Sequence, residues 1–114
     1  MTYEVRTLPE FERQAKRLVK KYPSLLHELQ ELGTRLSLAP EQGVPLGQNA
    51  FKIRLAIASK GRGKSGGARV ITLVFHVARR VYLMAIYDKS ETDSLSTSSI
   101  AALVQAALAN EGLQ

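Results

Sequence analysis

"FKIRLAIASKGRGKSGGARVITLVFHVARRVYLMAIYD", residues 51–88, decides the fold. Its first part, residues 51–57, alternates apolar residues with Lys52 and Arg54, which is the period-two pattern of a strand with one buried and one open face. Lys52 and Arg54 therefore point the same way. Two further apolar runs follow a glycine-rich segment, so we predict three consecutive antiparallel strands with the third one central. These two runs are residues 68–77 and 81–88.

The residues before this stretch predict a short strand and two helices. Residues 2–6 alternate sufficiently for the strand, and the sequence "TLPE" predicts a capping box in which Thr7 and Glu10 start the first helix. Apolar residues then recur at helical spacing until Pro23, which interrupts the helix. A leucine stripe predicts a second amphipathic helix that ends at Leu38 and packs against the first. The stripe is most simply part of the core, and it consists of Leu25, Leu26, Leu29, Leu32 and Leu36.

The remaining segments complete an α+β order. Residues 39–49 are rich in proline and glycine and predict the loop that joins the helices to the sheet. Residues 94–112 include an alanine-rich run and predict a final helix that ends near Gly112. The resulting order is strand, helix, helix, three strands and helix, within a single domain that spans residues 1–114.

Composition restricts the chemistry that this chain can use. Its 114 residues include no cysteine, which excludes disulfides and thiolate chemistry, and only two histidines, so we expect no metal site. No apolar run reaches the roughly 18 residues that a membrane span needs, and the first residues lack the apolar region of a signal peptide. We therefore expect a soluble cytoplasmic protein that does not bind membranes.

Positive charge is concentrated in the middle of the chain. The net charge is +6 and the isoelectric point is near 9.9, which favours a polyanionic partner. Nine of the 16 lysines and arginines lie in residues 52–89, where Asp88 is the one acidic residue. A charge run is ordinarily a solvated surface, but these cations lie beside strand patterns and a glycine-rich segment. This placement favours a site for an anion.

The sequence Gly63-Lys64-Ser65 is similar to the end of a nucleotide-binding P-loop. That motif requires a glycine five residues earlier and a helix directly after it. Ala58 occupies the earlier position, and the following residues predict a strand. The segment is better interpreted as a loop between two strands, in which glycine permits positive φ angles and lets the backbone approach an anion other than a bound nucleotide.

Arginine, lysine and tyrosine are the residue types left for chemistry. Paired carboxylates are missing from the predicted sheet, Ser65 has no local histidine partner, and His76 in an apolar strand is more often a satisfied core residue than a base. Arginine and lysine suit RNA phosphates and the charge that develops when a ribose 2′-hydroxyl attacks phosphorus. Tyr87 ends the third strand at an open surface, where neighbouring cations could lower its pKa for proton transfer or its ring could stack on a base. The plain alternative for Tyr87 is an amphipathic cap on the core.

Three ordered motifs in residues 51–91 resemble a known family. They are the strand sequence K-I-R, a Gly-Lys-rich loop that ends in S-G-G-A-R-V, and the segment Y-L-M-A-I-Y-D-K-S-E. Together they resemble the RelE/ParE superfamily of bacterial type II toxins and, within it, the HigB-like branch. The resemblance implies a small RelE-like α+β domain with a curved antiparallel β-sheet, two N-terminal helices and a C-terminal helix.

The resemblance also implies an activity and partners. Such a toxin is a ribosome-dependent mRNA endonuclease, or mRNA interferase, which cuts mRNA in the ribosomal A site without a cofactor and is held inactive by a cognate antitoxin, here expected to be of the helix-turn-helix type. Carried over by motif, Arg69 would stabilise the scissile phosphate, while Tyr87 and Lys89 would assist proton transfer or hold the base. The split between acid and base stays open. The implied catalytic set is Arg54, Arg69, Tyr87 and Lys89, and the implied RNA-binding set is Lys52, Lys60, Arg62 and Lys64.

Two other functions stay open on the same fold. A ParE-like protein would inhibit gyrase without cutting RNA. A non-catalytic RNA-binding module would use the basic face for phosphate contacts alone. The third alternative is a structural protein with a solvated basic surface, for which the glycine-rich loop would have no purpose.

Overall fold

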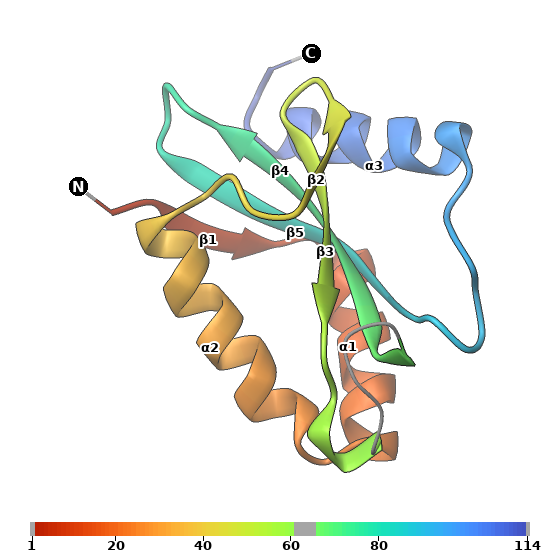
Figure 1. Ribbon diagram of the computed structural model, residues 1–114. Coiled ribbons are helices and arrows are strands. Elements are labelled where there is room, and N and C mark those ends of the chain that lie inside the picture. The colour runs from red at the N-terminus through yellow and green to blue at the C-terminus, as the bar shows by residue number, and fades with distance from the viewer. Residues whose placement is uncertain (1, 61–65, 114) are drawn as a thin grey trace.

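The computed structural model describes residues 2–60 and 66–113. Figure 1 shows the helices and strands that these residues form. The strands are β1 (Glu4–Thr7), β2 (Val44–Gly47), β3 (Ala50–Leu55), β4 (Ala68–Phe75) and β5 (Arg80–Asp88). The helices are α1 (Pro9–Lys21), α2 (Leu25–Leu38) and α3 (Thr97–Asn110), and a 3₁₀ turn spans Ala58–Lys60. The predicted order is confirmed, with β2 as an additional strand.

The strands form one mixed sheet in the order β1-β5-β4-β3-β2. Strands β2 to β5 pair antiparallel in sequence order, and the three consecutive strands predicted from residues 51–88 are β3, β4 and β5. β1 pairs with β5 in parallel, so the expectation of a purely antiparallel sheet is wrong at this strand. Parallel strands need a long connection, and the two helices and three strands between β1 and β5 provide one.

Strand β2 lies at the edge of the sheet, inside the segment 39–49 that we predicted as a loop. It pairs with the first three residues of β3, and all its residues are exposed. Pro45 is tolerated there because an edge strand has one side without ladder partners. Gln48 and Asn49 then turn the chain with positive φ angles of 54° and 66°. The sequence missed β2 because turn-forming residues outnumber apolar ones in this segment.

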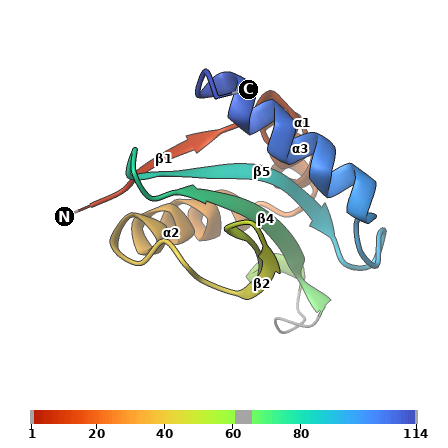
Figure 2. The same cartoon turned by 90° about the horizontal axis from the view of Figure 1, so that it is seen from above.

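The sheet has a core on each face. Figure 2 shows α2 and α3 on opposite sides of β4 and β5. On the first face, Leu18 of α1 packs with Leu25, Leu32 and Leu36 of α2 against the sheet, and all four are fully buried. Burying one leucine contributes about 1.5–3 kcal/mol, so this cluster is a major source of stability. The predicted stripe is confirmed except at Leu26, which is 54% exposed because it lies off the buried side of α2.

Helix α1 begins one residue later than predicted. Leu8 is the N-cap and Pro9 the first helical residue, which suits the fixed φ of proline. The hydroxyl group of Thr7 donates to Glu12, and Glu10 instead accepts hydrogen bonds from Arg13 and Gln14. The predicted capping box between Thr7 and Glu10 is therefore wrong.

Helix α3 is fixed at both ends. At its start, Ser96 Oγ accepts a hydrogen bond from the backbone N–H of Ser99 at 3.1 Å. At its end, Gly112 has a φ of 77°, as expected for the predicted terminus. Glu111 accepts hydrogen bonds there from the Arg80 guanidinium and the Tyr82 hydroxyl group of β5. None of the helices in the described part of the chain is long and apolar enough to cross a membrane.

Candidate functional site

Three predicted site residues lie opposite one another on adjacent strands. Arg54 of β3 pairs with Arg69 of β4, and Arg69 pairs with Tyr87 of β5. Residues directly opposite in an antiparallel pair share one face of the sheet, with Cβ atoms about 5 Å apart. We call Arg54, Arg69 and Tyr87 the cross-strand row. Residues that are distant in sequence thus form one continuous line across the sheet.

A bulge in β5 brings Tyr87 onto this face. Ile71 pairs with Ala85, but the next residue of β4 pairs with Leu83, so Met84 has no residue opposite it. One extra residue reverses the alternation of side chains along a strand. Tyr82 and Tyr87 are therefore both part of the core on the α3 face, although they are five positions apart and a regular strand would separate them. The sequence carried no clear signal of this bulge.

Arg69 and Tyr87 form the buried part of the row. Their exposed fractions are 4% and 7%, so the expectation of Tyr87 at an open surface is wrong. The Arg69 guanidinium donates to the backbone oxygen of Ala68 at 3.1 Å. The Tyr87 hydroxyl group has no hydrogen-bond partner among the described residues. A charged donor and an uncommitted hydroxyl group thus lie side by side.

Burial controls the protonation of Tyr87. Loss of water contact raises the pKa of its hydroxyl group above the usual value, and the positive charge of Arg69 offsets only part of this effect. The expectation that neighbouring cations lower this pKa towards neutrality is therefore wrong. Tyr87 stays protonated at neutral pH and can donate a proton or a hydrogen bond.

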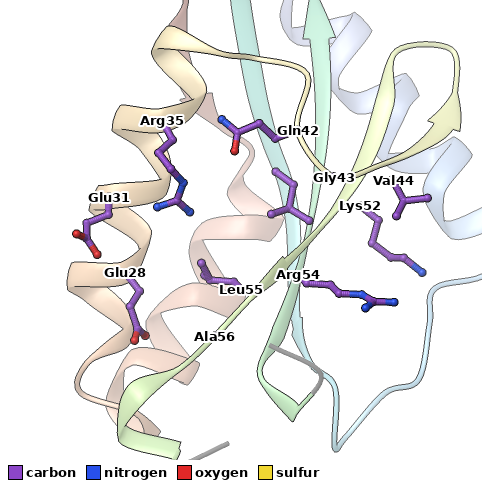
Figure 3. Close-up of a pocket in the computed structure, with 11 residues that line it drawn as sticks. Glu28, Glu31, Arg35, Gln42, Gly43, Val44, Lys52, Arg54, Leu55 and Ala56 are labelled. Carbon is purple, nitrogen blue, oxygen red and sulfur yellow. The ribbon is translucent and has the colours of Figure 1, made fainter. Parts of the chain in front are cut away.

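The outer end of the row lies on β3. Figure 3 shows Lys52 and Arg54 leaving this strand on the side away from α2. Arg54 is exposed and Lys52 is half-buried, and neither makes a hydrogen bond or an ion pair with a described residue. Two cations on one strand face that form no ion pair with a described residue can bind successive phosphates or carboxylates.

Lys89 and Asp93 lie in the segment that follows β5. The Lys89 ammonium donates to the Asp93 carboxylate. That hydrogen bond, together with the charges of Lys89, Arg69 and Lys52, lowers the pKa of Asp93. Asp93 is therefore an ionised acid that interacts with the positive charge near the row. Sequence reasoning missed it, because an isolated aspartate in an irregular segment belongs to no periodic pattern.

Lys60 is placed differently from the expected RNA contact. Its Nζ donates to the carboxylate of Asp88, and the two side chains are 8% and 0% exposed. Asp88 follows Tyr87 in β5 and contacts Tyr22 of α1, so this pair lies on the other face of the sheet from the row. The other two predicted contacts of the glycine-rich segment, Arg62 and Lys64, lie outside the described residues.

Comparison with known proteins identifies the architecture. No family model matches the sequence. Among solved structures, the chain is similar to the E. coli toxin RelE in the free state, a mutant in which two arginines are replaced by alanine, with a TM-score of 0.60 and 14% sequence identity. The similarity covers 82% of this chain and 90% of that chain. The chain has the RelE fold.

At this level of identity the similarity concerns the RelE fold alone. The predicted fold class is confirmed, whereas the HigB-like branch, the activity and the roles of individual residues remain predictions. The cross-strand row and its neighbours are therefore assessed on their own geometry.

His76 lies too far from the cross-strand row to act together with Arg69 and Tyr87. It follows β4 in the turn to β5, is exposed, and hydrogen-bonds with Tyr3 and Glu41. The interpretation as a buried core residue is wrong because β4 ends at Phe75. Seven residues of extended strand separate His76 from Arg69, which is about 24 Å at 3.4 Å per residue. Among the described residues, no three histidine, aspartate or glutamate side chains form a possible metal site.

A groove runs between α2 and the free edge of β3. It encloses about 850 Å³ and is lined by Glu28, Glu31 and Arg35 of the helix and by residues 52–56 of the strand segment (Figure 3). β2 pairs only with Ala50–Lys52, so the edge of β3 beyond Lys52 is open to this groove among the described residues. Arg54, the outer member of the cross-strand row, thus also lines this groove.

Proposed function

We propose that this chain is the toxin of a type II toxin–antitoxin system, of the HigB-like branch, and cleaves mRNA on the ribosome. The observation that carries the proposal is the cross-strand row, in which two guanidinium groups and a protonated hydroxyl group share one face of a RelE-fold sheet. Lys52 lies on the same strand face as Arg54 and extends the positive charge. The segments that resemble the toxin family contain these residues.

The proposed reaction is transfer of a phosphodiester to the adjacent ribose hydroxyl group. The 2′-oxygen forms a bond to phosphorus, its proton leaves to water, and the bond from phosphorus to the 5′-oxygen breaks. Arg69 and Arg54 stabilise the added negative charge on the phosphate oxygens, which is where fixed donors act most strongly. Tyr87 donates its proton to the leaving 5′-oxygen, because its raised pKa keeps that proton in place at neutral pH. Lys52 holds a neighbouring phosphate, and Lys89 assists proton transfer or holds the base.

The proposal includes a cognate antitoxin of the helix-turn-helix type. Neither Lys52 nor Arg54 forms an ion pair with a described residue, and an acidic segment of the antitoxin would neutralise their charge. Opposite charges make such association fast and specific. The antitoxin would then block the surface that RNA needs.

One alternative has a specific observation in its favour. Tyr87 and Arg69 are nearly buried, whereas Lys52 and Arg54 are accessible, as in a module that binds RNA phosphates without cutting them. In that case a substitution at Tyr87 would leave every RNA-dependent effect in place. The geometry of the cross-strand row gives no specific support to gyrase inhibition of the ParE type.

The test compares programmed ribosomes with the same mRNA free in solution. We expect the purified chain to cut mRNA only on the ribosome, and Arg69→Ala to abolish the cut. Arg79→Ala is the matched control, because it removes the same charge from the exposed turn between β4 and β5. Binding without a cut would support the RNA-binding module, and a supercoiling assay on gyrase tests the remaining alternative. A folded Arg69→Ala chain that cuts at the full rate would refute the role of the row.

A further inference from the structure

Asp88 is a fully buried carboxylate on the opposite face of the sheet from the cross-strand row. Its Oδ1 accepts hydrogen bonds from the Lys60 ammonium and from the backbone N–H and hydroxyl group of Ser90, the latter two at 2.9 and 2.7 Å. Its Oδ2 accepts one from the Tyr22 hydroxyl group at 2.8 Å. Burial alone would raise the pKa of Asp88, but Lys60, Ser90 and Tyr22 outweigh it and hold the pKa well below its usual range. Asp88 is therefore an ionised, fully paired group.

The donors to Asp88 come from three separate segments. Tyr22 is the C-cap of α1, and Ser90 follows β5. Lys60 ends the 3₁₀ turn, which is also attached to the start of α2 because Glu28 accepts from the backbone N–H of Ala58 at 2.7 Å. The Lys60 ammonium also lies 5.5 Å from the centre of the Tyr22 ring. A single carboxylate thus joins both helices on this face to the end of β5.

The same network sets the path of the chain beside the cross-strand row. The N–H groups of Glu91 and Thr92 both donate to the backbone oxygen of Asp88 at 3.0 Å, so the chain turns directly after β5. Lys89 lies in this turn, and its backbone N–H donates to the oxygen of Gly67 at 3.0 Å. A Cβ atom at Gly67 would lie 2.1 Å from the backbone oxygen of Leu55, so the backbone segments at Gly67 and Leu55 approach each other closely there.

We propose that Lys60 and Asp88 form a positioning pair that holds Lys89 and the end of β5 in register with the cross-strand row. The pair acts through the backbone of the turn, from the opposite face of the sheet, and Lys60 makes no contact with RNA. This inference rests on the proposed function for its effect on cleavage, and on the contacts above for its structure. It assigns to Lys60 a role different from that of Lys52, which lies on the same strand face as Arg54.

Salt dependence separates a positioning residue from a phosphate contact. Affinity for a single-stranded RNA oligonucleotide would be measured by fluorescence anisotropy over a range of salt concentrations, for the wild type, Lys52→Met and Lys60→Met. Each lost phosphate contact lowers the slope of log affinity against log salt by about 0.7. We expect that decrease for Lys52→Met and an unchanged slope for Lys60→Met. An equal decrease in both variants would overturn the proposal.

Cleavage on the ribosome gives the second readout. Misplacement by about 1 Å costs on the order of a hundredfold in rate, and we expect a loss of that order for Lys60→Met. Because this variant leaves a buried carboxylate without its cation, the double variant Lys60→Met, Asp88→Asn is tested beside it. Glu111→Gln is the control, since it weakens a partly buried ion pair, that with Arg80, at the far end of β5. Full cleavage by the double variant, or an equal loss in the control, would overturn the proposal.

Amide exchange measured without RNA distinguishes failure of this inference from failure of the proposed function. We expect the Lys89 amide to lose its protection in the double variant and to keep it in Glu111→Gln. If the wild type cuts no RNA but this pattern holds, the proposed function fails and the positioning pair stands. If Lys89 keeps its protection in the double variant, the positioning pair fails whatever the activity of the chain.

Discussion

Tyr87 carries a hydroxyl group that is buried and has no hydrogen-bond partner among the described residues. A buried polar group without a partner costs about 1–3 kcal/mol of stability. Groups of this kind are expected at functional or strained sites. The arrangement beside Arg69 therefore favours a role for Tyr87 in function over the plain alternative, a cap on the core.

Replacing Tyr87 by phenylalanine separates these two roles. We expect Tyr87→Phe to raise the free energy of unfolding by about 1 kcal/mol, because the unpaired hydroxyl group is removed. Cleavage on the ribosome should fall by about a hundredfold or more, because the proton donor is lost. Urea unfolding and a single-turnover cleavage assay measure the two effects. Tyr82→Phe is the control: its hydroxyl group is bonded to Glu111 and Asn110, so it should lose stability and keep cleavage.

A substitution at Asp93 would test how charge near the cross-strand row affects RNA affinity. Its carboxylate interacts with Lys89, Arg69 and Lys52 and reduces the positive charge that RNA meets. We expect Asp93→Asn to tighten RNA binding by up to about fivefold, since the interactions of an exposed charge are weak. The measurement is anisotropy at low salt. Glu41→Gln, which makes the same charge change near His76, should leave the affinity unchanged, and equal effects of both substitutions would argue against a local role for Asp93.

The residues of the row could be predicted from sequence, but their environment could not. Arg54, Arg69 and Tyr87 lie in the segments of the family resemblance, and strand alternation places Lys52 beside Arg54. The partners that decide protonation are distant: Lys60 lies 28 residues from Asp88. A single sequence without the fold does not reveal which distant residues meet, so the burial of Tyr87 and the pairing of Lys60 appear only in the structure.

At the scale of secondary-structure elements, Gly33 and Gly67 differ in the space around them. Gly33 lies inside α2, where an added Cβ meets nothing within 4 Å, whereas at Gly67 it would overlap the Leu55 backbone next to β4. We expect Gly33→Ala to raise the free energy of unfolding by about 0.5–1 kcal/mol through helix propensity. Gly67→Ala should lower it by about 1–3 kcal/mol, because β3 and β4 must separate there. Thermal unfolding measures both, and a stabilised Gly67→Ala chain would contradict the close approach.

The local elements were predictable because their signals repeat at short range. The leucines of α2 recur at helical spacing, and the alternation of β3 is visible in seven residues. The parallel pairing of β1 with β5 and the bulge at Met84 depend on contacts between distant segments. The bulge is the feature that matters most for the proposed function. Without it, the Tyr87 side chain would lie on the α1 face of the sheet and not beside Arg69.

The molecule as a whole has a net charge of +6, but several of its carboxylates contribute to its stability. The hydrogen bond from Arg17 lowers the pKa of Glu91, and those from Tyr82 and Arg80 lower the pKa of Glu111. The buried network around Lys60 does the same for Asp88. Each of these groups binds its proton more weakly in the folded than in the unfolded state. Their stabilisation is therefore present above the unfolded values near 4 and is lost as the pH falls through the folded values.

We expect the urea midpoint to be nearly constant between pH 7 and about 5 and to fall steeply below pH 4, where unfolded carboxylates gain protons first. Asp88 should contribute the largest single part of this fall, because its carboxylate is fully buried and holds four hydrogen bonds. The double variant Lys60→Met, Asp88→Asn should start from a lower midpoint at pH 7 and lose less between pH 4 and 2. An acid loss as steep as that of the wild type would show that the remaining carboxylates, and not the buried pair, set the acid stability of the fold.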